Sequence, residues 1–194
     1  MDDLLNFVIS FGVYIISGIV VFLIIKFLIA GVLKQYHSNW NTLIDGFDFS
    51  TQEFYKLLKE ELQNQGITNV TIKPVSHKEG SFFSSKRSYL RIKWKAYHYD
   101  ICAAPFGNGF FISWWLLYKN SLGQIIISKI PFVGRFLARQ WYPVTYYKID
   151  TASMFMSYAQ ASVLKVIDNI TNDKGVRALT EAERKPILNN IFVR

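Results

Sequence analysis

The sequence predicts an α+β protein: a single N-terminal transmembrane helix, then a domain of helices packed on an antiparallel meander sheet of three or four strands. Three observations predict it. Residues 4–25 form a run of 22 residues without a charged side chain. Apolar and polar residues then alternate in short segments separated by turn residues, which is typical of strands. Segments with helical spacing flank these strands, and the sequential hairpin connections argue against a parallel sheet.

The N-terminal run is long enough to be a membrane span. At about 1.5 Å per residue, a helix over these 22 residues is about 33 Å long, and the hydrocarbon core of a bilayer is about 30 Å thick. A cleaved signal peptide is the alternative, but it would need a basic segment before a shorter apolar core, and here Asp2 and Asp3 come first. We therefore expect residues 1–34 to form a permanent membrane anchor.

Basic residues beside the run predict its orientation. Lys26 and Lys34 follow it, and no Lys or Arg precedes it. The positive-inside rule then places the N-terminus outside and the rest of the chain in the cytoplasm. Cys102 is the only cysteine, which excludes an internal disulfide and agrees with a reducing compartment.

The composition predicts one folded, basic domain after the anchor. The chain has 194 residues, of which 51% are hydrophobic, and its formal net charge is +8. About 160 residues follow the anchor, which is enough chain for one domain with its own core. A basic domain held at a membrane meets anionic lipid headgroups first, and nucleic acid is the other acidic partner that this charge suggests.

The domain is expected to begin after a juxtamembrane linker over residues 35–49. This stretch is polar and rich in turn residues, and Trp40 within it is expected at the membrane–water interface. Ser50 and Glu53 then form a capping box, which predicts a helix that ends at Gly66. The domain itself is expected to occupy residues 50–175.

Four segments in the middle of the chain have the character of strands. They are residues 69–75, 89–94, 97–103 and 110–119. A tight turn near Lys95 joins the second segment to the third, and the strong hairpin signal Asn108-Gly109 joins the third to the fourth. These short connections predict that the strands pair with their neighbours in sequence.

Two helices are expected after the strands. Residues 151–170 read as one long helix, capped by Asp150. Thr180 and Glu183 form a second capping box, which predicts a short C-terminal helix within residues 176–194.

Residues 131–142 predict a further helix, with Pro131 at its first position and Pro143 after its end. A helical wheel separates its apolar residues from its basic ones: Phe132, Phe136 and Trp141 on one half, Arg135 and Arg139 on the other. We expect this helix to lie in the membrane interface, with its aromatic rings at the acyl boundary and its arginines at the phosphates. The alternative is a helix that buries its apolar half in the domain's own core.

A basic cluster lies in and beside the second strand. It consists of Lys86, Arg87, Arg91, Lys93 and Lys95. Tyr89 lies among them, and basic residues interleaved with aromatic ones suit lipid headgroups, an acidic protein surface or single-stranded nucleic acid. An ordinary solvated sheet face is the alternative. We expect an anionic membrane or protein partner ahead of nucleic acid.

Three residues with catalytic potential, His98, Asp100 and Cys102, alternate along the third strand and therefore share one face. Such a set suits nucleophilic catalysis, but neighbours in the row are about 6.6 Å apart, which is too far for direct hydrogen bonds. The three histidines lack metal-ligand spacing, and the glycines form no phosphate-binding loop. We therefore predict no catalytic, metal-binding or cofactor-binding residues.

Together these features predict a single-pass, membrane-anchored adaptor or scaffold. Its cytoplasmic domain would bind a protein partner, or another copy of itself, at an anionic membrane surface. Two alternatives stay open. One is a membrane-tethered enzyme with a site near Cys102, and the other is a nucleic-acid-binding module that uses the basic strand of residues 86–95.

Overall fold

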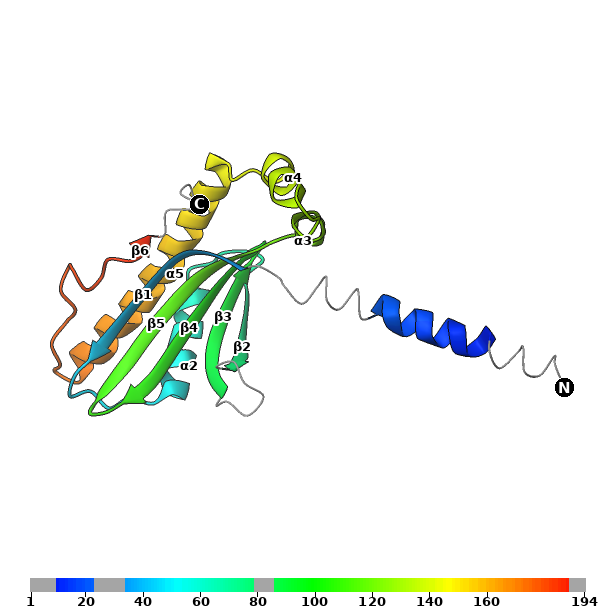
Figure 1. Ribbon diagram of the computed structural model, residues 1–194. Coiled ribbons are helices and arrows are strands. Elements are labelled where there is room, and N and C mark those ends of the chain that lie inside the picture. Colours follow the sequence, from blue (N-terminus) through cyan, green and yellow to red (C-terminus); the bar gives the residue numbers. More distant parts are fainter. Residues whose placement is uncertain (1–9, 23–33, 79–85, 189–194) are drawn as a thin grey trace. The chain divides into compact units, whose positions relative to one another are not determined.

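The computed structural model describes residues 10–22, 34–78 and 86–188 (Figure 1). The chain divides into two units, Lys34–Lys119 with Thr145–Arg194 and Met1–Leu33 with Asn120–Val144. The first of these, the sheet unit, combines an antiparallel sheet with helices, which confirms the predicted α+β class.

The sheet has six strands, which corrects the expected number of three or four. The strands lie in the order β2-β3-β4-β5-β1-β6, and each neighbouring pair is antiparallel (Figure 1). Their bounds are Lys34–Ile44 for β1, Thr71–Lys78 for β2, Lys86–Trp94 for β3, Tyr97–Phe106 for β4, Gly109–Lys119 for β5 and Ile187–Leu188 for β6. The predicted meander is the run from β2 to β5, and the additional strands are β1 and β6.

The strand β1 occupies the stretch that was expected to be a linker. It pairs with β5, with a register shift between Tyr36 and Ser38. Trp40 on this strand is 2% exposed, and its indole Nε1 donates to the backbone carbonyl of Glu183 at 2.5 Å. This corrects the expectation that Trp40 lies at a membrane interface. The strand escaped prediction because its Asn and Ser content gives it low β-propensity and its partner lies far along the chain.

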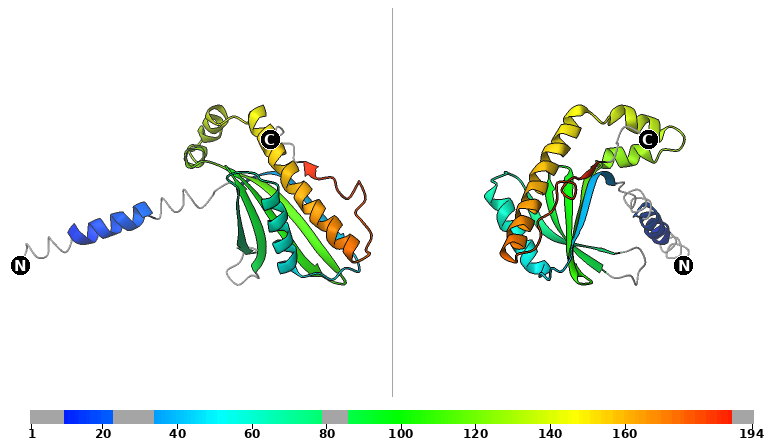
Figure 2. Two further views of the ribbon diagram at one scale, coloured as in Figure 1. Left: turned by 180° about the vertical axis from the view of Figure 1, so that it is seen from behind. Right: turned by 90° about the vertical axis from the view of Figure 1, so that its left-hand side faces the viewer.

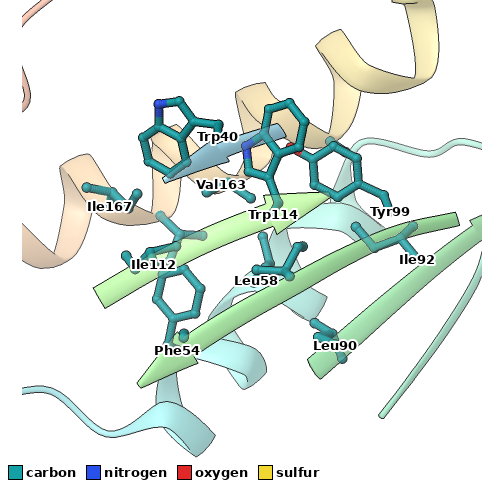
Figure 3. Packing of buried hydrophobic residues seen from close by; sticks show 14 of the residues in the cluster. Trp40, Phe54, Leu58, Leu90, Ile92, Tyr99, Ile112, Trp114, Val163 and Ile167 are labelled. Atoms are coloured by element: carbon teal, nitrogen blue, oxygen red, sulfur yellow. The ribbon is translucent and has the colours of Figure 1, made fainter. Parts of the chain in front are cut away.

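Two helices, α2 (Thr51–Asn64) and α5 (Tyr146–Asp173), lie on the same face of the sheet (Figure 2). The predicted N-cap of α2 is confirmed, because the Ser50 hydroxyl accepts from the backbone N–H of Glu53 at 3.4 Å. The hydrophobic core fills the space between this face and the helices (Figure 3). At its centre the rings of Tyr99 and Trp114 stack with their centroids 4.6 Å apart.

The helix α5 is longer than the sequence suggested. Its N-cap is Thr145, whose hydroxyl accepts from the backbone N–H of Lys148 at 3.3 Å. Threonine is a good N-cap and the preceding Pro143 suits a segment outside the helix, so the start lies before Asp150.

The expected C-terminal helix is absent from residues 176–188, where the chain forms turns and then β6. The capping box itself does form, because the Thr180 N–H and hydroxyl both donate to the Glu183 carboxylate, at 2.7 and 2.9 Å. Pro186 explains why no helix grows from it. Proline cannot donate to a helical hydrogen bond, and it disfavours the helical region for the preceding Lys185. Residues 189–194 lie outside the described part of the chain.

The second unit contains a helix over residues 10–22 and the pair α3 (Leu122–Ser128) and α4 (Gly134–Trp141). Among residues 10–22, 34–78 and 86–188, no helix has the length and apolar character that crossing a membrane requires. The predicted span over residues 4–25 continues past this helix at both ends, into residues 4–9 and 23–25, which lie outside the described residues. The helix α4 begins at Gly134, three residues later than the proline pattern predicted.

Candidate binding face of the sheet

The candidate site lies on the sheet face opposite α2 and α5. Along β4, Tyr99 and Ile101 point toward the helices and belong to the core. His98, Asp100 and Cys102 alternate with them and therefore point to the other side. The strand registers place side chains of β2, β3 and β5 on that same side. We call this surface the open face; its members on these four strands include Lys73, Val75, His77, Arg87, Tyr89, Arg91, Lys93, His98, Asp100, Cys102, Phe111, Ser113 and Trp115.

An ion-pair network forms the centre of the open face. The Arg91 guanidinium binds the Asp100 carboxylate with two nitrogens, Nε to Oδ1 and Nη2 to Oδ2, each at 2.6 Å. The His77 Nε2 lies 3.2 Å from Asp100 Oδ2. Burial by itself would raise the pKa of Asp100, but the contacts of Arg91 and His77 outweigh it and hold that pKa below its usual value. The network therefore keeps a buried carboxylate ionised and fully engaged.

His98 lies beside this network and is neutral at physiological pH. Burial lowers its pKa to about 4, and the positive charge of Arg91 acts in the same direction. In the register, His98 is opposite Lys93 on β3 and Leu117 on β5. A histidine in this position offers hydrogen bonds at pH 7 and does not exchange protons readily.

The thiol of Cys102 is buried, with 1% of the residue exposed. Burial raises its pKa, and the neighbouring Arg87 opposes that effect without cancelling it. Nucleophilic cysteines need a thiolate, which requires a lowered pKa and access. Cys102 has neither of these properties.

Tyr55 of α2 reaches the sheet where β3 and β4 stop pairing. The last Cα pair of these strands is Leu90 with Ile101. Beyond it, the Tyr55 hydroxyl lies 3.1 Å from the Ser88 carbonyl and 3.2 Å from the Ile101 carbonyl, and it accepts from the Ala103 N–H at 3.0 Å. The phenol thus links β3 and β4 where their ladder is interrupted.

The predicted basic cluster is divided by the fold. Arg91 is committed to Asp100, whereas Arg87 and Lys93 are exposed. Lys95 lies in the β3–β4 turn at a φ of +52°, with its Nζ 4.5 Å from the centroid of the Trp94 ring. Lys86 begins β3, and its side chain lies outside the described part of the structure.

The remaining predicted residues belong to the second unit. Phe132, Phe136 and Trp141 are exposed, as is Arg139. Arg135 lies on α4, and its side chain is not among those described. These residues therefore belong to a different unit from the strands that form the open face.

Sequence reasoning missed Lys73 and His77 as members of the site. In the register they are opposite Arg91 and Arg87, so β2 extends the basic surface of β3. One signal for the Arg91–Asp100 pair was present, because a tight turn near Lys95 places residues 91 and 100 opposite each other. For His77 no local signal existed, because only the pairing of β2 with β3 brings it near Asp100.

In the described residues, no three His, Cys, Asp or Glu side chains come together as metal ligands. Comparison with known proteins finds no matching family model and no matching curated protein.

Proposed function

We propose that this chain is a non-enzymatic, membrane-anchored adaptor whose open face binds a protein partner at an anionic membrane surface. The observation that carries the proposal is the open face itself. Its centre is an ion-paired network around Asp100, and its surroundings are exposed basic and aromatic side chains such as Lys93 and Trp115. Such a surface offers charge and aromatic contact to an acidic partner.

The uncharged run over residues 4–25 supports the anchoring part of the proposal. Its described portion, residues 10–22, is helical and carries exposed apolar side chains around its circumference, for example Ile15, Ile16 and Val20. An apolar helix surface of this kind is typical of a segment that meets lipid or another helix. We propose the orientation that the flanking lysines favour, with the N-terminus outside and the sheet unit in the cytoplasm.

Binding by the face, rather than by the edge, fits the strand order. The edge strand β2 carries Pro74, which has no N–H to offer an added strand. A partner that extended the sheet at this edge would lose a ladder hydrogen bond. The exposed side chains of Lys73, Arg87 and Lys93 instead suit a carboxylate-rich surface that lies across the strands.

The chemistry of the central residues favours binding over catalysis. A general base should have a pKa near the working pH, and that of His98 is about 4. The Asp100 carboxylate is engaged by Arg91, and the Cys102 thiol is protonated and buried. The nucleic-acid alternative is weaker for a related reason, since Arg91 is not available to a phosphate.

The test is purification of the full-length chain from membranes in mild detergent. We expect a stoichiometric partner, or a homo-oligomer, that is lost from the double variant Lys93→Glu/Arg87→Glu. The matched control is Lys56→Glu/Lys59→Glu, which makes the same charge change at exposed positions of α2. Recovery of a strictly monomeric protein without a co-purifying species would contradict the proposal, as would equal loss from both variants.

A further inference from the structure

The helices α3 and α4 form a tightly closed hairpin within residues 120–144. A Cβ atom built on Gly134 would collide with the backbone carbonyl oxygen of Ile127, and one built on Gly123 would collide with the hydroxyl of Tyr142. The approach at Gly134 is against backbone atoms and requires glycine, whereas at Gly123 the neighbour is the tip of the Tyr142 side chain. The Gly134 N–H donates to the Ile130 carbonyl at 3.0 Å, which closes the connection. The hairpin is therefore a compact element of defined shape.

The outer surface of this hairpin is strongly apolar. Large hydrophobic side chains are exposed along both helices and their connection: Leu122, Ile126, Ile130, Phe132, Val133, Phe136 and Trp141. Many large apolar side chains exposed within one short segment are typical of an interaction site.

Phe132 at the connection is the most unusual of them. It is fully exposed, and its φ is +65°, in the left-handed region that a residue with a Cβ rarely adopts. An aromatic side chain held outward at the cost of backbone strain is typical of a functional contact. The geometry of the connection thus presents Phe132 as the tip of the hairpin.

The charge of the hairpin identifies the class of its partner. Residues 120–144 contain Lys129, Arg135 and Arg139 and no Asp or Glu. A second copy of the hairpin would bring the same positive charge against itself, so self-association is disfavoured. Aromatic and aliphatic side chains with basic residues and no acidic ones match the boundary between anionic headgroups and acyl chains.

We propose that the hairpin of residues 120–144 inserts Phe132 and its apolar neighbours into the interface of an anionic leaflet, as a second membrane contact of the protein. The hairpin does not cross the bilayer, because α4 has eight residues and is about 12 Å long. This inference rests on the proposed membrane location and is independent of the proposed binding at the open face. The anchor would raise the effective concentration of lipid at the hairpin, so a modest intrinsic affinity suffices.

The test places a probe at the tip in the full-length chain. Phe132→Cys carries an environment-sensitive fluorophore, and the protein is reconstituted in nanodiscs of phosphatidylcholine alone or with added phosphatidylserine. We expect blue-shifted emission and quenching by spin-labelled lipid in the anionic discs, both weakened by salt. Two controls are labelled in the same way. The signal of the unsubstituted chain shows how much label reacts with Cys102, and the signal of Gln63→Cys, at an exposed position of α2, shows nonspecific adsorption to the discs.

Charge reversal provides the second arm of the test. In the Phe132→Cys background, Arg135→Glu/Arg139→Glu should lower the equilibrium constant between immersed and aqueous probe by about fivefold per basic charge removed. A probe that stays aqueous in anionic discs, in protein whose anchor is inserted, would overturn the inference and leave the adaptor proposal intact. A blue shift that appears only with a co-purified protein, without quenching by lipid, would also overturn it.

Discussion

The Arg91 guanidinium and the Asp100 carboxylate form a two-point ion pair that is almost completely enclosed. The side chains are 13% and 4% exposed, and both carboxylate oxygens accept from Arg91 at 2.6 Å. The pair joins β3 to β4 at the centre of the open face. Bidentate geometry of this kind fixes the relative position of the two strands as well as contributing energy.

Removal of one partner should therefore destabilise the fold strongly. We expect Arg91→Ala to lower the free energy of unfolding by about 3–5 kcal/mol, because the buried Asp100 carboxylate loses the partner that binds both of its oxygens and keeps only the contact with His77. Replacing both residues with apolar ones, Arg91→Met/Asp100→Leu, should restore most of the loss. Urea unfolding of the full-length chain in detergent micelles, followed by tryptophan fluorescence, measures both.

The control for this prediction is the pair between Lys165 and Glu61 on α5 and α2. Lys165 is 60% exposed, so Lys165→Ala should cost less than about 1 kcal/mol. Equal effects of Lys165→Ala and Arg91→Ala would contradict the assignment of a special role to the buried pair.

His98 should make stability depend on pH. Its folded pKa of about 4 lies below the unfolded value of 6.5, so the unfolded state binds the proton more readily between these values. Stability should accordingly be complete above about pH 6.5 and decrease as pH falls toward 4, by roughly 2–3 kcal/mol. His98→Gln removes this titration, so the difference in urea midpoint between pH 7 and pH 4.5 should shrink. An unchanged difference would show that His98 is not responsible.

Tyr55→Phe should loosen the junction between β3 and β4. The variant keeps the ring and removes the hydroxyl that accepts from the Ala103 N–H at 3.0 Å. An unsatisfied backbone group at this position costs about 1–3 kcal/mol. Hydrogen exchange at the Ala103 amide should accelerate, whereas Tyr146→Phe, at an exposed position, should leave it unchanged. Continued protection of the amide in Tyr55→Phe would exclude this role.

The parts of the fold that could be predicted from sequence are those encoded locally. The Ser50 capping box, the β3–β4 turn near Lys95 and the β4–β5 hairpin each depend on residues a few positions apart, although the hairpin's two-residue loop is Gly107-Asn108, one position before the predicted Asn108-Gly109. These signals were enough for the central meander and for α2. A local signal also misled at Thr180, where Pro186 prevents the helix that the capping box would start.

The parts that escaped prediction depend on contacts between distant segments. Trp40 resembles an interfacial tryptophan in sequence, and only the pairing of β1 with β5 shows it to be core. The open face likewise depends on such a contact, because it is formed by β3, β4 and β5, which short turns connect, together with β2. His77 reaches Asp100 only through the β2–β3 register, which no local pattern specifies.

Tyr99 and Tyr97 lie on the same side of β4, but removing the hydroxyl should change the stability of the protein differently at the two positions. The Tyr97 hydroxyl donates to the Lys148 carbonyl at 2.7 Å, so Tyr97→Phe should cost about 1 kcal/mol. The buried Tyr99 hydroxyl finds no hydrogen-bond partner among the described residues. Tyr99→Phe should therefore be neutral or stabilising by about 1 kcal/mol. Urea unfolding of the two variants side by side decides this, and a larger loss for Tyr99→Phe would contradict it.

The reactivity of the Cys102 thiol distinguishes the adaptor proposal from the enzymatic alternative. Because the thiol is buried and burial raises its pKa, a maleimide should react slowly with the native chain at pH 7 and rapidly after unfolding in urea. Cys102→Ala removes only a small buried group and should cost about 1 kcal/mol of stability. Partner recovery from membranes should be unaffected, since a protonated thiol beneath the surface contributes no contact. Fast labelling of the native protein, or loss of the partner from a folded Cys102→Ala variant, would instead favour a reactive site at this residue.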